Sequence, residues 1–259
     1  MTCVAAVGDI HLDRDLAGHL RPALDEAATQ ANLLLLAGDL TRHGTIDEAE
    51  VVADELAGLP IPVVCVLGNH DYHSDQQDAI RRLLERDGVV VLEGETFTTD
   101  VGGVTVGVAG AKGFGVGFAG RCASDFGEPE MKVFTRYAKS SAQSLRNALE
   151  ELDADVRIAM THYAPVEDTL RGEPPEIWPF LGSYLLAEAA DAVGVDLYVH
   201  GHAHAGAEQG MTAGGISVRN VAQPVLRRPY ALYRVGEGSE PQEGADPVAR
   251  RGTLTAKSR

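Results

Sequence analysis

Short apolar runs alternate with segments of helical periodicity over the first third of the chain. The apolar runs predict four buried strands, at Cys3–Val7, Leu33–Leu36, a run that begins between Pro60 and Pro62 and ends at Leu67, and Val89–Leu92. The segments between them predict three helices, at Asp15–Gln30, Thr45–Leu59 and Ser74–Asp87. Thr45 and Glu48 have the spacing of a capping box, and Ser74 is expected to cap the third helix. This alternation predicts a parallel sheet that is covered on both faces.

The pattern changes after Leu92. Two strands are predicted at Phe97–Val101 and Val104–Ala109, and the Gly102-Gly103 pair between them indicates a β-hairpin. A glycine-rich segment follows, and the remaining elements are a long helix at Lys132–Leu152, strands at Val156–Met160, Asp196–His200, Ile216–Val221 and Tyr230–Val235, and a helix at Tyr184–Val193. A βα half followed by antiparallel pieces predicts an α/β fold in which two packed mixed β-sheets are flanked by helices, an α/β/β/α four-layer sandwich.

Composition narrows the class of protein. The chain has 259 residues, of which 44% are hydrophobic, enough for one sizeable core. We expect one domain over residues 1–235 and a disordered tail over 236–259, where apolar residues are scarce. With 22 basic and 38 acidic residues the net charge is −16, which argues against binding of long nucleic acids. A small phosphorylated substrate is compatible with this charge if metal ions supply local positive charge.

Cysteine usage and hydropathy indicate a cytoplasmic protein. Cys3, Cys65 and Cys122 are far apart and odd in number, so neither a disulfide framework nor a thiolate zinc site is expected. The first fifteen residues lack the basic region and the long apolar run of a signal peptide. No stretch approaches about 18 consecutive apolar residues, so no contact with a membrane is expected. The sequence does not indicate an oligomeric state.

Polar clusters follow five of the predicted strands, most of them after a glycine. They read Gly8-Asp9-Ile10-His11, Gly38-Asp39, Gly68-Asn69-His70-Asp71, Thr161-His162 and His200-Gly201-His202-Ala203-His204. Because ligands bind at the carboxyl ends of the strands in open α/β sheets, we expect these clusters to converge. Asp, His and Asn without Cys suit divalent ions such as Mn²⁺, Fe²⁺ or Zn²⁺. There are too many donors for one ion, which favours two ions that share a bridging carboxylate.

The order of these clusters resembles the calcineurin-like metallophosphoesterase superfamily, whose motifs run DxH, GDxx, GNH followed by D or E, H, and GHxH. The resemblance extends from about residue 3 to about residue 225. It implies one metal ion on Asp9, His11, Asp39 and His204, and a second on Asp39, Asn69, His162 and His202, with Asp39 bridging. It also implies that His70 lies beside the substrate as an acid or phosphate donor, oriented by Asp39 or Asp71.

The resemblance implies a binuclear metal-dependent phosphoesterase, a hydrolase that acts on a small phosphodiester or phosphomonoester. Hydrolysis would proceed by in-line attack of a metal-bridging hydroxide, with His70 assisting. The protein Ser/Thr phosphatases of the family are less favoured, because their third motif usually follows Arg and here Leu67 precedes Gly68. The alternative is a non-catalytic scaffold or binding module on the same fold, although such proteins typically lose ligand residues that are intact here.

Residues that select the substrate are harder to identify. From Lys112 to Arg146 there are six basic and three acidic residues, a local excess of positive charge. Lys112 or Arg121 could reach an anionic substrate from a flexible lid, with Phe114 and Phe118 placed against a base or ring, and His73 is a further candidate because it follows a metal motif. The alternative is a solvated loop and helix face. For His200, packing at a strand end competes with a place in the site.

Overall fold

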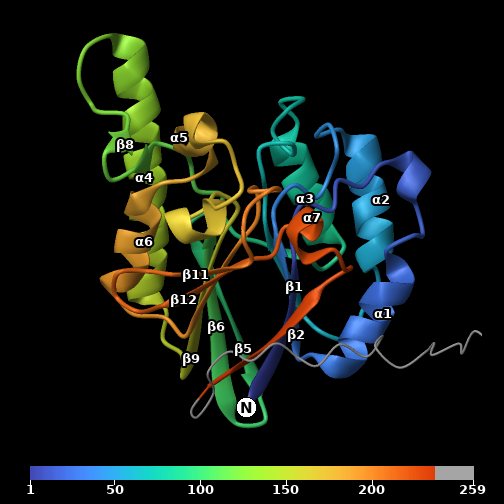
Figure 1. The fold of residues 1–259 in the computed structure, drawn as a ribbon. Coiled ribbons are helices and arrows are strands. Elements are labelled where there is room, and N and C mark those ends of the chain that lie inside the picture. Colours follow the sequence, from blue (N-terminus) through green and yellow to red (C-terminus); the bar gives the residue numbers. More distant parts are fainter. Residues whose placement is uncertain (237–259) are drawn as a thin grey trace, which may run out of the picture.

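The computed structural model describes residues 1–236, and the expected disordered tail lies outside the described residues except for Gly236. Two sheets pack face to face in the middle of the molecule, with helices on both outer sides (Figure 1). The predicted α/β fold of two mixed sheets flanked by helices is therefore confirmed. Within residues 1–236, no helix combines the length and the apolar character needed to cross a membrane.

The first sheet has the strand order β13-β1-β2-β3-β4. Its strands are β1 (Thr2–Val7), β2 (Leu33–Ala37), β3 (Val63–Val66), β4 (Val90–Val91) and β13 (Ala231–Val235). The first four are parallel, as the sequence predicts, and β13 pairs with β1 antiparallel, with Thr2 opposite Val235. All five residues of β2 are buried, which accounts for its unbroken run of apolar residues.

The second sheet has the order β11-β12-β10-β9-β6-β5. Its strands are β5 (Glu95–Val101), β6 (Val104–Ala111), β9 (Val156–Thr161), β10 (Leu197–His200), β11 (Gln209–Met211) and β12 (Ser217–Asn220). The hairpin of β5 and β6 is confirmed, and β6, β9, β10 and β12 run parallel. A separate ribbon is formed by β7 (Gly117–Phe118) and β8 (Arg121–Cys122).

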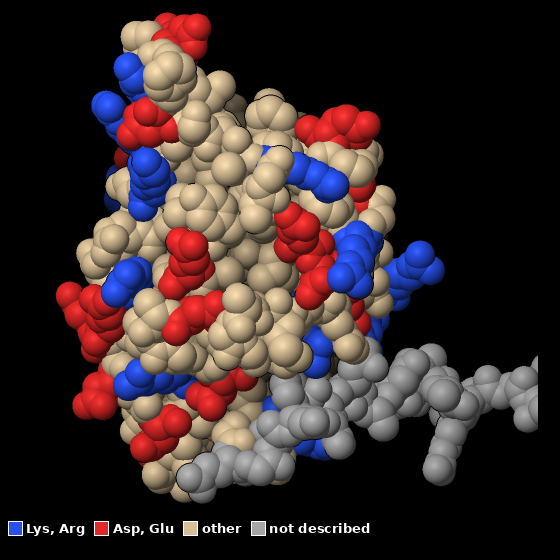
Figure 2. Space-filling view, turned by 60° about the vertical axis from the view of Figure 1, so that its left-hand side comes forward, with Lys and Arg blue, Asp and Glu red and all other residues tan. Residues whose placement is uncertain are grey.

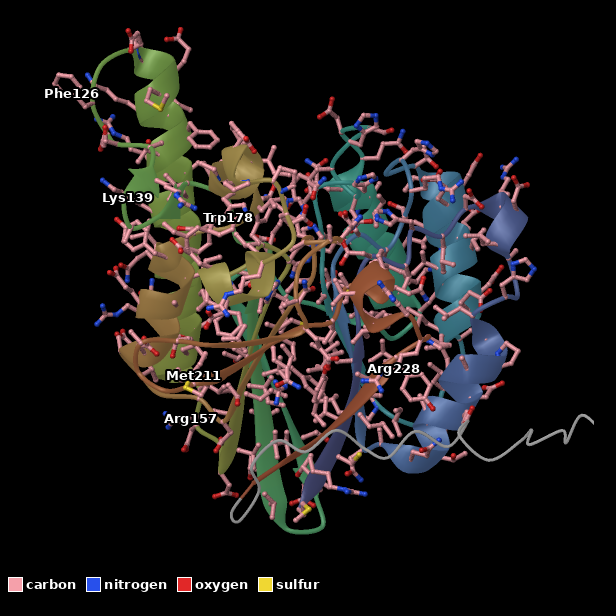
Figure 3. All side chains as sticks on the ribbon, in the orientation of Figure 1. Phe126, Lys139, Arg157, Trp178, Met211 and Arg228 are labelled. Atoms are coloured by element: carbon pink, nitrogen blue, oxygen red, sulfur yellow. The ribbon has the colours of Figure 1, made fainter. Side chains whose placement is uncertain are left out.

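Helices cover the outer face of each sheet (Figure 1). The first sheet carries α1 (Arg21–Gln30), α2 (Ile46–Leu56) and α3 (Gln77–Arg86), and the second carries α4 (Pro129–Glu151) and α6 (Tyr184–Asp191). Short helical turns occupy the loops, namely η1 (Arg14–Leu16), η2 (Glu167–Leu170), η3 (Pro175–Ile177), α5 (Trp178–Leu181) and α7 (Gln223–Leu226). The N-terminal end of α4 projects beyond the sheets, and the exposed Phe126 lies on the loop that precedes it (Figure 3).

Two helix starts differ from the sequence prediction. Instead of one helix over Asp15–Gln30, the chain forms η1, turns at Gly18 with φ +79°, and begins α1 only at Arg21. The capping box of Thr45 and Glu48 is confirmed, but Ser74 does not cap α3. The Ser74 hydroxyl donates instead to the carbonyl of His43 at 2.6 Å, so Ser74 links two loops.

The main core lies between the two sheets. Leu33–Leu36 from the first sheet packs in the same buried cluster as Ile158, Met160 and Val199 from the second. Because this core holds both sheets in a fixed relation, the loops after β1, β2, β3, β9 and β10 meet at one edge. Figure 2 shows Lys and Arg side chains scattered among Asp and Glu on the visible face rather than gathered in one patch.

Candidate metal centre

The loops that leave the strand ends have unusual backbone conformations. Asp9, His11, Asp39 and His202 have φ values of 57°, 44°, 52° and 70°. For residues other than glycine, this left-handed backbone conformation costs about 1–2 kcal/mol. Only two other non-glycine residues in the described part of the chain adopt it, so the strain is concentrated where the predicted ligands lie. Such concentration is typical of functional sites, where the surrounding fold enforces the geometry.

The glycines of the motifs allow the loops to approach closely. A Cβ atom at Gly68 would overlap the carboxylate of Asp39, and one at Gly201 would overlap that of Asp9. A Cβ atom at Gly38 would lie 2.6 Å from Nδ1 of His162. These glycines are therefore required by packing, because a larger residue would push a ligand side chain out of the centre.

The first group of candidate ligands comprises Asp9, His11, Asp39 and His204. One donor atom from each of the four lies within 4.8 Å of the others. Nε2 of His204 lies 2.8 Å from Oδ1 of Asp9, and Nε2 of His11 lies 3.9 Å from Oδ2 of Asp39. Two carboxylates and two imidazoles in this arrangement are a common donor set for a divalent ion.

The second group shares Asp39 with the first and adds His162 and His202, again within 4.8 Å. Nε2 of His162 lies 3.4 Å from Oδ1 of Asp39 and 3.1 Å from Nδ1 of His202. The amide oxygen of Asn69 is 2.9 Å from the same Nε2 atom. The structure thus brings together all seven residues expected from the sequence, with Asp39 between the two groups.

The hydrogen bonds of the imidazoles fit a cation in the second group. Nδ1 of His162 donates to the carbonyl of Ala37 at 2.9 Å, and Nε2 of His202 donates to the carbonyl of Phe180 at 3.2 Å. In the neutral rings the two nitrogens that face each other therefore carry lone pairs, which repel unless a positive charge lies between them. Backbone carbonyls that fix the ring of a metal-binding histidine in this way are a usual feature of metal sites.

The pKa values of the candidate ligands also indicate that this centre accommodates a cation. Burial opposes protonation of His162, but Asp39 and Asp9 outweigh it and raise the pKa of His162 to about 9. Burial also disfavours the charged form of Asp39, yet His162 and the backbone N–H of His70 hold its pKa well below the usual range. Burial and the neighbouring His162 lower the pKa of His202 to about 3. The centre thus favours an ionised Asp39 together with a compensating positive charge.

His70 lies beside the first group with its ring partly open to solvent. Its Nδ1 donates to the carbonyl of Arg42 at 2.7 Å, and its Nε2 is 3.9 Å from Oδ2 of Asp39. The ring of His11 packs against it at 4.4 Å between centroids, and 42% of the His70 side chain is exposed. Nε2 of His70 is therefore the ring nitrogen that a substrate could reach.

Of the two residues that the sequence offered for orienting His70, Asp39 lies against it, and within residues 1–236 no hydrogen bond joins Asp71 to the His70 ring. The Asp71 carboxylate is fully buried and accepts hydrogen bonds from Gly68 N (2.8 Å), Leu40 N (3.2 Å), Thr41 N (2.9 Å) and Thr41 Oγ1 (2.7 Å). These donors belong to the loops after β2 and β3. Asp71 therefore joins the loop that carries Asp39 to the loop that carries Asn69 and His70, and the Arg42 carbonyl takes the orienting role.

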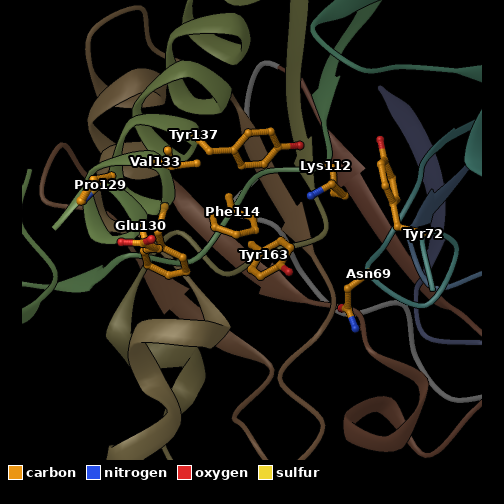
Figure 4. A pocket seen from close by; sticks show the side chains of 10 residues that line it. Asn69, Tyr72, Lys112, Phe114, Pro129, Glu130, Val133, Tyr137 and Tyr163 are labelled. Carbon is orange, nitrogen blue, oxygen red and sulfur yellow. The ribbon is translucent and has the colours of Figure 1, made fainter. Parts of the chain in front are cut away.

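The three expected substrate-binding residues lie in different places. Lys112 is buried and lines a cavity of about 690 Å³ that Asn69 also borders (Figure 4). Arg121 lies on β8 with its guanidinium 5.0 Å from the ring of Trp178, and it does not line this cavity. His73 is exposed, does not line the cavity, and donates its backbone N–H to the carbonyl of His70.

Four further residues lie near the site, and the sequence offered little or no indication of their roles. His200 is fully buried, contacts the Thr169 hydroxyl at 2.8 Å, and packs at the strand end. The amide of Asn220 donates to the carbonyl of Ala203 and so holds the loop between His202 and His204. Sequence reasoning missed Tyr137 and Tyr163 in the cavity wall. For Tyr163 the position next to His162 was an available signal, whereas nothing local marked Tyr137.

The chain matches a known protein family and shares its fold with solved structures. A family model described as calcineurin-like phosphoesterase matches residues 4–206. A search of curated proteins found no significant match. Among solved structures, phosphopantetheinyl hydrolase (PptH) from Mycobacterium tuberculosis is similar with a TM-score of 0.65 at 18% identity, covering 92% of this chain and 96% of that chain.

Two further structures share the fold at lower similarity. A putative 5′-nucleotidase from Staphylococcus aureus, in complex with alpha-ketoglutarate, has a TM-score of 0.56 at 16% identity, covering 98% of this chain and 56% of that chain. A Plasmodium protein described as the anchor in the inner membrane complex has a TM-score of 0.52 at 13% identity, covering 86% of this chain and 72% of that chain. At these identities the likeness establishes the fold.

Proposed function

Because the chain belongs to the calcineurin-like phosphoesterase family, we propose that it is a binuclear metal-dependent phosphoesterase that hydrolyses a small phosphoric ester. The observation that carries the proposal is the pair of ligand groups that share Asp39 at one sheet edge, with the exposed ring of His70 beside them. A single Asp or His at a strand end would have many explanations. Seven converging donors from five loops, four of them on strained backbone, are best explained by metal binding.

The donor set suits two divalent ions, with Mn²⁺, Fe²⁺ and Zn²⁺ as candidates because oxygen and imidazole ligands are mixed. Asp9, His11, Asp39 and His204 would hold one ion, and Asp39, Asn69, His162 and His202 would hold the other. When bound, such ions would lower the pKa of water and neutralise charge on the phosphoryl oxygens. Phosphoryl transfer needs mainly positioning and charge neutralisation, so no covalent nucleophile from the protein is required.

His70 would handle the proton of the leaving group. Its Nδ1–H is held by the Arg42 carbonyl, which leaves Nε2 as the reactive nitrogen. The backbone N–H of His70 also donates to Oδ1 of Asp39 at 2.8 Å, so the position of this residue is tied to the shared ligand. In the imidazolium form, Nε2 could donate to a phosphoryl oxygen or to the departing alkoxide.

A non-catalytic binding module on the same fold is the less favoured alternative. A binding surface has no need for two groups of ligand atoms that each lie within 4.8 Å and share Asp39, with Asn69 beside them, nor for strained backbone at four of these residues. The names of the fold neighbours supply candidate substrates only, namely phosphopantetheinyl esters and nucleotides.

Metal analysis coupled to a substrate panel tests the proposal. The protein would be reconstituted with Mn²⁺, its ion content measured, and its turnover followed with bis-p-nitrophenyl phosphate, p-nitrophenyl phosphate, cyclic nucleotides and a phosphopantetheinyl ester. We expect two ions per chain and hydrolysis of at least one ester. A matched control is Asp54→Ala, an exposed carboxylate on α2. One ion or none, with no hydrolysis under any metal, would reject the proposal.

A further inference from the structure

The cavity of about 690 Å³ lies beside the second ligand group and is walled mainly by aromatic rings (Figure 4). Its volume is in the range of pockets that bind small organic molecules. Asn69 and Tyr72 come from the loop after β3, Lys112 and Phe114 follow β6, and Tyr137 belongs to α4. Because Asn69 is both a candidate ligand and a wall residue, the cavity is continuous with the metal centre.

The register of the second sheet places the cavity wall beside the second ligand group. β6 and β9 are neighbouring parallel strands, and Ala111 at the end of β6 pairs with Thr161 at the end of β9. The carbonyl of Lys112 then accepts the backbone N–H groups of His162 at 3.0 Å and Tyr163 at 3.2 Å. The ring of Tyr163 lies 4.4 Å from that of His202. The cavity wall therefore runs directly into the side chains of the second ligand group.

Lys112 places a buried amino group in this cavity, where burial lowers its pKa and the Glu93 and Asp39 carboxylates favour its charged form. Its side chain is almost inaccessible, and its Nζ donates to the carbonyl of Gly113 at 3.3 Å. Four rings surround Nζ at 4.9–5.3 Å from their centroids, those of Tyr72, Phe114, Tyr137 and Tyr163. An ammonium group has three donors, so two are left without an oxygen acceptor among the described residues. Among the described residues that line the cavity, Lys112 is the one cation, and its nitrogen points inward (Figure 4).

The rings make the cavity suitable for a flat, partly polar group. Phe114 packs edge-on against Tyr137 at 4.8 Å and against Phe134 at 5.2 Å, so the aromatic wall is fixed by its own contacts. The hydroxyls of Tyr72, Tyr137 and Tyr163 have no hydrogen-bond partner among residues 1–236. An alkyl chain would cover these hydroxyls without pairing them, whereas an aromatic heterocycle offers both a face for stacking and edge atoms for hydrogen bonds.

We propose that this cavity binds an aromatic ring carried by the phosphoester, and that the Lys112 ammonium binds a phosphoryl oxygen of the same molecule. The proposal rests on the phosphoesterase function proposed above and names its substrate class, esters of alcohols that bear an aromatic ring such as a nucleobase. The ring would lie against Phe114 and Tyr137, while the phosphorus lies at the shared edge near Asn69. Lys112 is thus a substrate-binding residue, whose amino group points into the cavity and carries the positive charge that a phosphoryl oxygen needs (Figure 4).

Binding of two phosphonates that resist hydrolysis tests the proposal separately from turnover. Phenylphosphonate and methylphosphonate carry the same anionic group and differ in the ring, and each would be titrated calorimetrically into the Mn²⁺-loaded protein. We expect phenylphosphonate to bind about tenfold more tightly, as about 1.4 kcal/mol of ring contact would give. Phe114→Ala and Tyr137→Ala should bring the ratio close to one. Tyr137 is 46% exposed, so its replacement should leave the fold intact.

Lys112→Met should weaken both phosphonates by a similar factor, about tenfold, because it removes a charged donor and leaves the rings in place. The matched control is Lys139→Met on the exposed side of α4, which removes the same charge away from the cavity (Figure 3) and should change neither affinity. Equal affinities for phenylphosphonate and methylphosphonate in the unaltered protein would overturn the ring site. Butylphosphonate binding as tightly as phenylphosphonate would also overturn it, in favour of a general apolar pocket.

Turnover separates a failure of the cavity from a failure of the catalytic proposal. Benzyl phosphate and cyclohexylmethyl phosphate both release a primary alcohol and differ in whether the ring is aromatic, so their kcat/KM ratio, followed by phosphate release, reports the ring. We expect the benzyl ester to be favoured about tenfold, and Tyr137→Ala to remove the preference through KM. Hydrolysis of both esters with no preference would overturn the cavity assignment alone. Ring-dependent phosphonate binding without hydrolysis of any ester would instead support the cavity and reject the phosphoesterase function.

Discussion

Replacing Asp71 tests whether the metal centre depends on a buried carboxylate that touches neither metal ligand side chains nor the His70 ring. Asp71 joins the loop after β2 to the loop after β3 through four hydrogen bonds. Asp71→Ala removes all four acceptor contacts, and Asp71→Asn keeps the shape but turns one oxygen into a donor. Both changes should lower the stability of the metal-free protein.

The expected loss can be worked from the contacts. Three of the four donors are backbone N–H groups, those of Leu40, Thr41 and Gly68, and Asp71 is fully buried. At about 1 kcal/mol for each N–H left without an acceptor, Asp71→Ala should cost about 3 kcal/mol in the free energy of unfolding. Asp71→Asn can place its NH₂ group at the Oδ1 position, where the Thr41 hydroxyl can accept from it and only the Thr41 N–H loses its acceptor, so about 1 kcal/mol is expected.

Thermal unfolding in the presence of a chelator measures this loss without a contribution from bound metal. For a chain of this size, about 1 kcal/mol shifts the melting temperature by roughly 2–4 °C, so Asp71→Ala should melt about 6–12 °C lower. Asp54→Ala is the matched control, since this exposed carboxylate on α2 should change stability by less than about 0.5 kcal/mol. Mn²⁺ affinity should also fall, because Asp39 and Asn69 lose their fixed relation.

An unchanged melting temperature for Asp71→Ala would refute the reasoning. If turnover fell while stability and metal affinity stayed at the level of the control, Asp71 would act on the His70 ring after all. Asp71, rather than Asp39, would then be the orienting residue of the two that the sequence offered, and the hydrogen bonds of Asp71 to the loops would be energetically minor.

Three further predictions concern the ligands and His70. Asp39→Ala should abolish binding of both ions, because both groups use this carboxylate, whereas His204→Ala should remove only one in elemental analysis. His70→Ala should keep both ions and lower turnover about 10²–10⁴-fold for alkyl esters but less for p-nitrophenyl esters, whose leaving group needs no proton; loss of metal would make His70 a ligand. The folded-state pKa of His162, about 9, exceeds its ordinary 6.5, so the stabilisation it gives the metal-free protein is complete below pH 6.5 and is lost as pH rises through 9. A His162→Gln variant should not show this decline in melting temperature, and an equal decline in both proteins would contradict the assignment.

Local patterns in the sequence determined the parts of the structure that short-range physics controls. Continuous apolar runs predicted β1 to β4, because parallel strands buried on both faces leave no room for polar side chains. The capping box at Thr45 placed the start of α2. The polar clusters after strand ends predicted which side chains would converge, because the topology of an open α/β sheet brings those ends together whatever the loop details.

Tertiary structure decided the features that depend on residues distant in the chain. Three histidines at alternate positions, 200, 202 and 204, would share one face of a strand, yet β10 ends at His200 and the left-handed backbone of His202 turns its ring to the site. His200 is left to pack against Thr169. Asp71 could not be distinguished from a catalytic group, because its partners are backbone N–H groups that no side-chain pattern reveals.

The aromatic cavity could not be predicted from the sequence, because its wall is built from residues that are distant in the chain. Lys112, Tyr137 and Tyr163 lie on three separate elements, and only the register of β6 with β9 and the packing of α4 on the second sheet bring them together. Likewise β13 pairs with β1 across almost the whole described chain. Strand formation follows from local sequence, but the partner of a strand and the walls of a cavity are set by which long-range contacts bury the most apolar surface, and that balance is decided by the whole fold.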